Sequence, residues 1–150
     1  MACIASIAIK PRKRGLMQVV PEAVVTVNAG ITGDCRGRGG IHQNRQLTVV
    51  LEAQWMEACR EVGMELPWVL RRANILICGG FRFEPSDVGR KIYLGSNVVL
   101  FITGETKPCN RMDEAYRGLQ AALTPLWRAG VTCRVLEGGA IRLHDSAIVM

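Results

Sequence analysis

The chain has few aromatic residues: they make up 5% of its 150 residues, while 49% are hydrophobic and 21% are charged. The hydrophobic and charged fractions are ordinary for a globular protein, so we expect a core of aliphatic side chains. Long hydrophobic runs are also lacking. The longest, around NVVLFI at residues 97–102, is far too short to span a bilayer. At this length we expect one domain, residues 1–150.

The first residues lack the order of a signal peptide, and the cysteines lack the spacing of a zinc site. MACIASIAIKPRKRG places apolar residues before basic ones, the reverse of a secretory leader, so we expect a cytoplasmic protein.

No C-x-x-C pair occurs, which excludes the usual zinc and thioredoxin-type spacings. In a reducing compartment most cysteines are small buried hydrophobes rather than disulfide partners. The six are Cys3, Cys35, Cys59, Cys78, Cys109 and Cys133.

Negative charge is in the minority. The net charge is +6 and the isoelectric point is about 9.3, which suits nucleic acid, a membrane surface or a phosphorylated small molecule. Apart from KPRKR at residues 10–14, the basic residues are scattered, as in a lined pocket or a solvated surface. Few aromatic residues and no nucleic-acid-binding motif count against nucleic acid as a partner.

Most of the sequence predicts short strands separated by glycine-rich turns, which favours an all-β barrel or sandwich. Each candidate strand is rich in β-branched or aliphatic residues. The candidates are residues 3–9, 23–27, 46–51, 74–78, 91–94, 97–103, 131–136 and 139–143.

Two segments instead have helical spacing. Residues 52–62 place apolar side chains on one stripe, and Gly63 supplies a C-terminal stop. Residues 112–123 form a second apolar stripe, with Asn110 as the expected N-cap and Pro125 as the end.

Cys109 lies in KPCNRM, directly before this second helix and between Lys107 and Arg111. A helix N-terminus and nearby cations favour the thiolate, which can attack an electrophile, carry sulfur as a persulfide or bind a soft metal. The alternative is a buried loop cysteine. The local sequence favours neither reading.

A second stretch, GITGDCRGRGG, combines a glycine-rich loop with Arg36 and Arg38. Backbone N–H groups in such a loop can approach an anion, and the arginines add charge. The signal is weak because basic glycine-rich turns are common, and the stretch matches no phosphate-loop or dinucleotide pattern. For Cys35, inside this stretch, a structural role is favoured.

A third stretch, LRRANILICGG, places Arg71, Arg72 and Asn74 before an apolar strand. Arginine suits phosphates and carboxylates, but for Arg71 a basic strand entry in water is the better interpretation. His42 and His144 are isolated, and each is expected to be a surface or loop histidine.

Together and in order, these stretches resemble the MOSC domain. They are AGITGDCRGRGG with NRQLTVV, LRRANILICGG, LGSNVVLFITGETKPCNRMDEAYRGLQAAL and RAGVTCRVLEGGAIRL, and they cover the chain from about Ile4 to the last strand. This domain ends the molybdenum cofactor sulfurases and also occurs as small stand-alone bacterial proteins. The resemblance implies a mainly β fold, a barrel related to that of pyruvate kinase with two or more short helices.

The resemblance also implies a site. The family's motif cysteine falls on Cys109, which would carry sulfur or ligate molybdenum in the molybdenum cofactor (molybdopterin). Basic and amide side chains line the family's cofactor cleft, and the cofactor's terminal phosphate would account for the positive charge. The matching or adjacent positions here are Arg72, Asn74, Arg36, Arg45, Lys107 and Asn110.

Two functions stay open from the sequence. Some family members reduce N-hydroxylated bases or amidoximes, which predicts a small-molecule substrate and an electron-donor reductase. Others adjoin a pyridoxal-phosphate-dependent desulfurase, which predicts a sulfur carrier with a cysteine desulfurase as partner. We expect neither nucleic acid nor a membrane as partner, and a monomer or homodimer. A barrel that has lost the family chemistry is disfavoured by the intact KPCNRM.

Three features set the sequence apart from larger relatives. Its 150 residues include neither a desulfurase domain nor the N-terminal β-domain of larger relatives, so we expect cofactor contacts from such domains to be missing. It also has His144 where many relatives have a glycine before the aspartate, in RLHDSAIVM.

Overall fold

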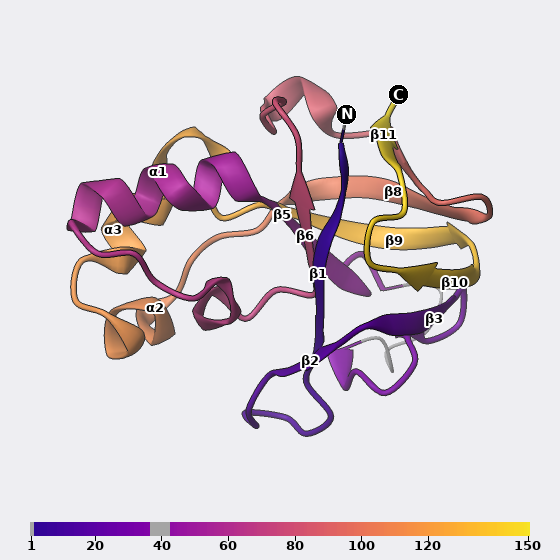
Figure 1. Cartoon of the computed structure of the whole chain (residues 1–150), viewed down its shortest axis with the longest axis horizontal. Helices are drawn as coiled ribbons and strands as arrows, with labels where there is room; N and C mark the ends of the chain where they lie inside the picture. The colour runs from indigo at the N-terminus through magenta and orange to yellow at the C-terminus, as the bar shows by residue number, and fades with distance from the viewer. Residues whose placement is uncertain (1, 37–42) are drawn as a thin grey trace.

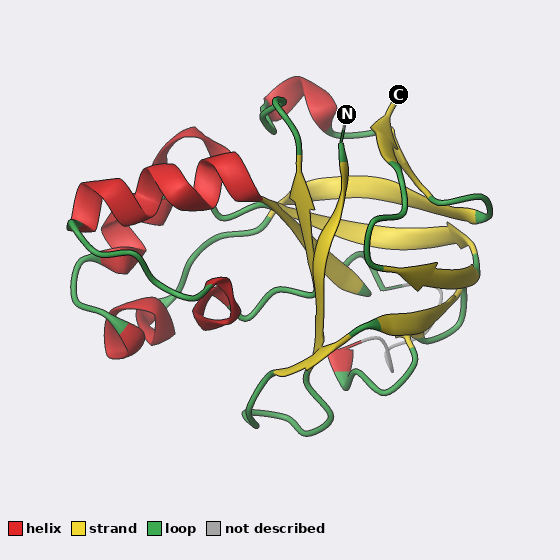
Figure 2. Cartoon of the chain, in the orientation of Figure 1, coloured by secondary structure: helices red, strands yellow, loops and turns green. Residues whose placement is uncertain are grey.

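A large mixed β-sheet, with the α-helices gathered at one side of it, makes up the computed structural model, which describes residues 2–36 and 43–150 (Figures 1 and 2). The strands are β1 (Cys3–Ile9), β2 (Gln18–Val20), β3 (Glu22–Thr26), β4 (Gly30–Ile31), β5 (Leu47–Leu51), β6 (Ile75–Cys78), β7 (Lys91–Leu94), β8 (Val98–Glu105), β9 (Val131–Glu137), β10 (Gly139–Arg142) and β11 (Ala147–Val149). The helices are α1 (Glu52–Val62), α2 (Asn110–Ala115) and α3 (Leu119–Leu123), with 3₁₀ turns η2 (Trp68–Arg71), η3 (Pro85–Asp87) and η4 (Pro125–Trp127).

The strands pair into two sheets. The larger has the order β11-β7-β8-β9-β5-β6-β1-β2, and the smaller has the order β10-β3-β4. Among the described strands every pair is antiparallel except β5 with β6, which run parallel because α1 forms the crossover between them. The mainly β class with short helices is confirmed.

The expected closed barrel is not present as a continuous ladder among the described strands, because β11 and β2 form the two edges of the larger sheet. The two ends nevertheless approach each other. The start of β1 meets the segment before β11 through an isolated bridge between Cys3 and Ser146. Backbone hydrogen bonds from Ile4 N–H to the Asp145 carbonyl (2.8 Å) and from Ala147 N–H to the Ala2 carbonyl (3.1 Å) join the same segments.

Two apolar cores follow from this layout. Strand β9 alternates, with Val131, Cys133 and Val135 buried, so it places one face on the sheet core and the other outward. Central strand β5 is buried throughout. The second core lies between α1, α2, α3 and the sheet, where Trp55 and Ala58 of α1 pack in the same cluster as residues of both other helices.

Helix α1 has the predicted bounds, and Gly63 ends it in the left-handed conformation at φ 73°. The predicted single helix at 112–123 is wrong: the chain forms α2 and α3 with a break between them. Gly118 has φ 93° at the break, and an oxygen of Asp113 accepts a hydrogen bond from the N–H of Gln120 in α3. The Asp113 side chain in α2 therefore binds the first turn of α3.

None of the helices in residues 2–36 and 43–150 has the length and apolarity needed to cross a membrane.

Candidate anion and thiol site

The turn before β6 directs two adjacent arginines to different places. Turn η2 ends at Arg71, and Arg72 takes the left-handed conformation at φ 62°, with its N–H donating to the Val69 carbonyl at 3.0 Å. The Arg72 side chain reaches outward and its Nη2 donates to the Gly15 carbonyl at 2.7 Å. Arg71 turns inward and is only 4% exposed.

The interpretation of Arg71 as a strand entry in water was wrong. Its Nε donates to the Ala129 carbonyl at 2.9 Å, and its Nη2 donates to Thr106 Oγ1 at 3.0 Å. Thr106 is itself buried and donates its N–H to the Gly130 carbonyl at 3.0 Å. Since Thr106 stands three residues before Cys109, the buried guanidinium fixes the start of the loop that carries the cysteine.

Asn74 is fully buried, and both its amide oxygen and its amide nitrogen form hydrogen bonds inside the protein. Its Nδ2 donates to the Ala8 carbonyl at 3.1 Å and to Asp34 Oδ1 at 3.2 Å. Its Oδ1 accepts from the N–H of Thr48 at 3.0 Å and from the hydroxyl of the same residue at 3.3 Å. A side chain satisfied on all sides has no group left for a ligand. In this structure the Asn74 side chain holds neighbouring segments of the protein together, and its direct contact with a cofactor stays a prediction.

Asn74 positions Asp34, which lies within the glycine-rich stretch GITGDCRGRGG. Asp34 is buried, and its carboxylate accepts from the backbone N–H of Lys10 at 2.6 Å and of Arg36 at 3.1 Å. The side-chain amide of Gln43 donates to the carbonyls of both Arg36 and Arg45. These two arginines are thereby held together. Arg38 and His42, also singled out in the sequence, lie outside the described residues.

Six basic side chains act on one another and form what we call the cationic cluster. They are Lys10, Arg36, Arg45, Arg71, Arg72 and Arg111. Burial, and then the charges of Arg45 and Arg36, lower the pKa of Arg71 from 12.5 to about 10. Burial, and then the charge of Arg111, lower the pKa of Arg72. The cluster therefore holds positive charge at a cost that a bound anion would relieve.

The cluster contains little compensating negative charge. The pKa of Arg36 is lowered first by burial and then by Arg45, with Asp34 opposing the shift. Within residues 2–36 and 43–150, none of the four ion pairs involves a member of the cluster. Nη1 of Arg36 is a buried donor without a hydrogen-bond partner in that part of the chain. A buried donor left unpaired is the arrangement expected where an anion would bind.

Cys109 stands at the edge of this cluster. A negative charge on Cys109 would oppose the lowering of the pKa of both Arg71 and Arg72, which places the thiol within electrostatic reach of the two guanidinium groups. Cys109 is exposed, so the alternative of a buried loop cysteine is wrong. Cys109 also takes the N-cap position of α2, with its carbonyl accepting from Met112 N–H at 3.0 Å, which displaces Asn110 from the predicted cap into the helix.

The remaining predicted site residues, Lys107 and Asn110, lie on the surface. Lys107 and Asn110 flank Cys109 and are exposed, but neither has a described contact with the cluster. Sequence reasoning missed Arg71, Lys10 and Asp34 as parts of the site. Local signals were absent, because the partners of Arg71 lie 35 and 58 positions away in the chain.

No group of three or more His, Cys, Asp or Glu side chains that could hold a metal ion occurs among the described residues. Two cysteines lie near the cationic cluster: Cys109, which is exposed, and Cys35, which is partly buried. A cofactor that brings an anionic group and a metal would have the exposed thiol of Cys109 for the metal and the basic side chains of the cluster for the anionic group. The donor set therefore fits such a cofactor.

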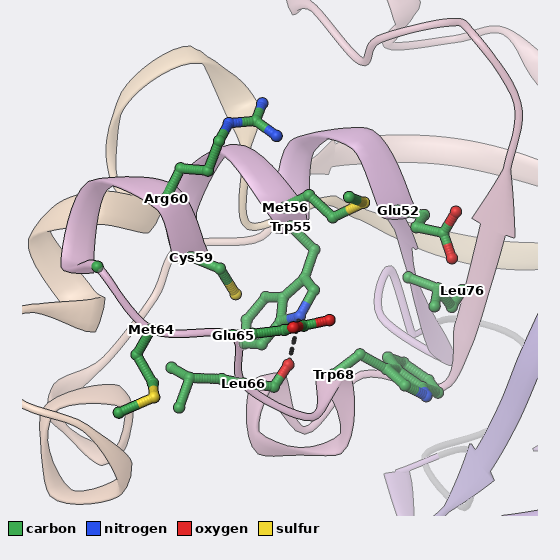
Figure 3. Close-up of a pocket in the computed structure, with 11 residues that line it drawn as sticks. Glu52, Trp55, Met56, Cys59, Arg60, Met64, Glu65, Leu66, Trp68 and Leu76 are labelled. Atoms are coloured by element: carbon green, nitrogen blue, oxygen red, sulfur yellow. Dashed lines mark hydrogen bonds between the residues drawn. The ribbon is translucent and has the colours of Figure 1, made fainter.

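A separate cleft of about 730 Å³ lies beside α1 and contains none of the predicted site residues (Figure 3). Its lining is mainly apolar, with Trp55, Met56 and Cys59 from α1 and Trp68 from η2. The indole N–H of Trp55 donates to the Leu66 carbonyl at 3.2 Å, which joins the helix to the segment after it.

Comparison with solved structures finds the same fold in bacterial proteins. YuaD from Bacillus subtilis is 22% identical, with 99% of this chain and 96% of that chain covered and a TM-score of 0.82. YiiM from Geobacillus stearothermophilus is 15% identical over 100% and 75% of the two chains, with a TM-score of 0.72. YiiM from Escherichia coli is 14% identical over 100% and 70%, with a TM-score of 0.67.

No protein-family model and no curated protein matches the sequence. YuaD and YiiM are small stand-alone proteins of the MOSC family, which fits the resemblance in the sequence. At these identities the likeness establishes that the chain has their fold.

Proposed function

We propose that this chain is a MOSC-type protein whose cationic cluster binds the anionic pterin part of the molybdenum cofactor. Cys109 would be the sulfur ligand to the metal. The observation that carries the proposal is the exposed thiol of Cys109 on the loop that Arg71 anchors through Thr106, next to a cluster with no ion pair to a carboxylate in the described chain.

Each member of the site would have a separate task. Arg72, Arg36 and Arg45 would hold the cofactor's phosphate, because guanidinium groups suit phosphate oxygens and Nη1 of Arg36 has no hydrogen-bond partner among the described residues. Arg71 would not need to touch the cofactor: it anchors the loop of Cys109 through Thr106. When bound, the cofactor would supply a redox-active metal.

The reaction proposed for this arrangement is the two-electron reduction of an N-hydroxylated small molecule, with electrons from a separate reductase. The support is the resemblance of the sequence to the MOSC family together with the thiol at the cationic cluster. Thiolate is a soft ligand suited to such a metal centre.

One observation favours a second candidate, a sulfur carrier. Among the six cysteines, Cys109 alone is exposed, so it is the thiol that a partner desulfurase could reach most easily. Its thiolate would take the outer sulfur of the desulfurase's persulfide, leaving a persulfide on Cys109 and a thiolate on the donor.

Elemental mass spectrometry tests the two candidates on protein made in cells that synthesise the cofactor. We expect near-stoichiometric molybdenum in the wild type and in Cys133→Ala, a buried cysteine outside the cluster, but none in Cys109→Ala. Folding of each variant is checked by circular dichroism. Molybdenum retained in folded Cys109→Ala would contradict the role of the thiol. Absence of molybdenum from folded wild type, with a persulfide found on Cys109, would favour the sulfur carrier.

A further inference from the structure

Two cysteines outside the cationic cluster lie against each other. Cys3 in β1 and Cys78 in β6 are direct partners in the antiparallel register, and their Sγ atoms are 3.0 Å apart. Both thiols are free and partly buried, and Cys78 Sγ also donates to the Cys3 carbonyl at 3.4 Å. Nothing in the proposed function uses either thiol.

The backbone already provides the geometry of a disulfide. Directly opposed residues in an antiparallel pair have Cα atoms about 4.5–5.5 Å apart, inside the range of about 4.4–6.8 Å found across disulfides. The sulfur atoms need to approach by only about 1 Å to reach the bonded distance of about 2.05 Å. Side-chain rotation can supply this, so neither strand has to move.

The neighbouring residues keep the two strands in close approach. Beyond Cys78, Gly79 has φ 145°, and a Cβ placed there would meet the Cβ of Ala2 at 2.7 Å. Only glycine permits so close an approach, and it brings the start of β1 onto the end of β6. Because β1 meets Asp145 and Ser146 at the same place, a bond here would fix the junction between the two ends of the larger sheet.

We propose that Cys3 and Cys78 form a dithiol–disulfide site that exchanges with small disulfides of the glutathione class. One thiolate attacks the small disulfide, forming a mixed disulfide and releasing one thiol. The second thiolate then displaces the other small thiol, so two protein thiols are oxidised and one small disulfide is reduced to two thiols. In a reducing compartment the pair stays a dithiol.

The test uses the full-length Cys109→Ser variant, which removes the exposed thiol, incubated natively with oxidised glutathione. Products are resolved by intact mass after alkylation, and by peptide mapping. We expect the Cys3–Cys78 bond to exceed glutathione adducts on these two cysteines by at least about tenfold, because contact between the thiols makes the second displacement intramolecular. Adducts that persist on either cysteine, or a pair that stays reduced, would overturn the proposal.

Two controls make the result specific. Adding Cys78→Ser should leave a stable glutathione adduct on Cys3, and adding Cys3→Ser should leave one on Cys78, since the resolving thiol is gone. In concentrated urea the preference for the internal bond should fall at least about tenfold, because 75 residues then separate the two thiols without a fold to join them. An unchanged preference in urea would show that the strands do not create the site.

Discussion

Replacing Asn74 by alanine tests the buried network on which the cationic cluster rests. The substitution removes hydrogen bonds to the Ala8 carbonyl, to Asp34 and to both donors of Thr48. Asp34 keeps the backbone N–H groups of Lys10 and Arg36. The backbone N–H of Thr48 and the carbonyl of Ala8 each lose their hydrogen bond to Asn74 inside the protein.

The expected change in the free energy of unfolding follows from the two backbone groups that lose a hydrogen bond, the Thr48 N–H and the Ala8 carbonyl. A buried donor or acceptor that loses its partner costs about 1–3 kcal/mol, so we expect Asn74→Ala to lower the free energy of unfolding by about 3 kcal/mol. This is a large fraction of the roughly 5–15 kcal/mol typical of a domain. With a urea dependence of about 2 kcal/mol per molar, the midpoint should fall by about 1.5 M.

The assay is equilibrium urea unfolding followed by circular dichroism, with Asn97→Ala as the matched control. Asn97 is exposed, and its replacement should change the free energy of unfolding by no more than about 0.5 kcal/mol. A loss below about 1 kcal/mol for Asn74→Ala, at unchanged slope, would refute the reasoning that its amide supports the strands around the site.

Three other predictions can be checked with the same protein. Gly130→Ala should lower the free energy of unfolding by at least about 3 kcal/mol, because Gly130 has φ 97° and a Cβ there would meet the Val49 carbonyl oxygen at 2.2 Å. Gly63→Ala is the control. Gly63 has φ 73° with open space around it, so this substitution should lower the free energy of unfolding by only about 1 kcal/mol in the same urea assay. The hydrogen bond from Arg82 lowers the pKa of Glu57 below its ordinary 4.5. The pair therefore stabilises the fold above pH 4.5, and this stabilisation is lost as the pH falls through the lowered pKa. Urea midpoints measured across this pH range should drop more in the wild type than in Glu57→Gln. Pyrophosphate at about 100 times its dissociation constant should stabilise the fold by about 2.7 kcal/mol, seen as a raised melting temperature that matched ionic strength of chloride does not reproduce; an equal rise in chloride would argue against a specific anion site.

The strands and the first helix could be predicted because their patterns are local. Alternation in CIASIAI and KIYL gives the bounds of β1 and β7 directly, and the stripe ending at Gly63 gives those of α1. Strands β2, β4 and β11 have only two or three residues each, so their pairing partners define them more than any pattern does.

The site could be predicted only in part, because local sequence patterns do not show which distant residues the fold brings together. Cys109 and Arg72 were visible from their neighbours in the sequence. The burial of Arg71 depends on Ala129 and Thr106, which only the fold brings close. The role of Asn74 likewise depends on Asp34, 40 positions away. The helix break at Gly118 was not predicted, because it depends on the hydrogen bond that Asp113 accepts from the N–H of Gln120, seven positions away.

The reactivity of Cys109 toward charged reagents tests most directly whether the thiol and the cationic cluster form one site. The measurement is the ratio of alkylation rates with iodoacetate and iodoacetamide at Cys109, followed by peptide mass spectrometry in folded and in urea-unfolded protein. If the cluster attracts anions to the thiol, this ratio should be at least about tenfold higher in the folded protein, and it should fall with added salt and in Arg72→Gln. A ratio that is the same in folded and unfolded protein would contradict the account, because the cationic cluster would then have no influence on the thiol.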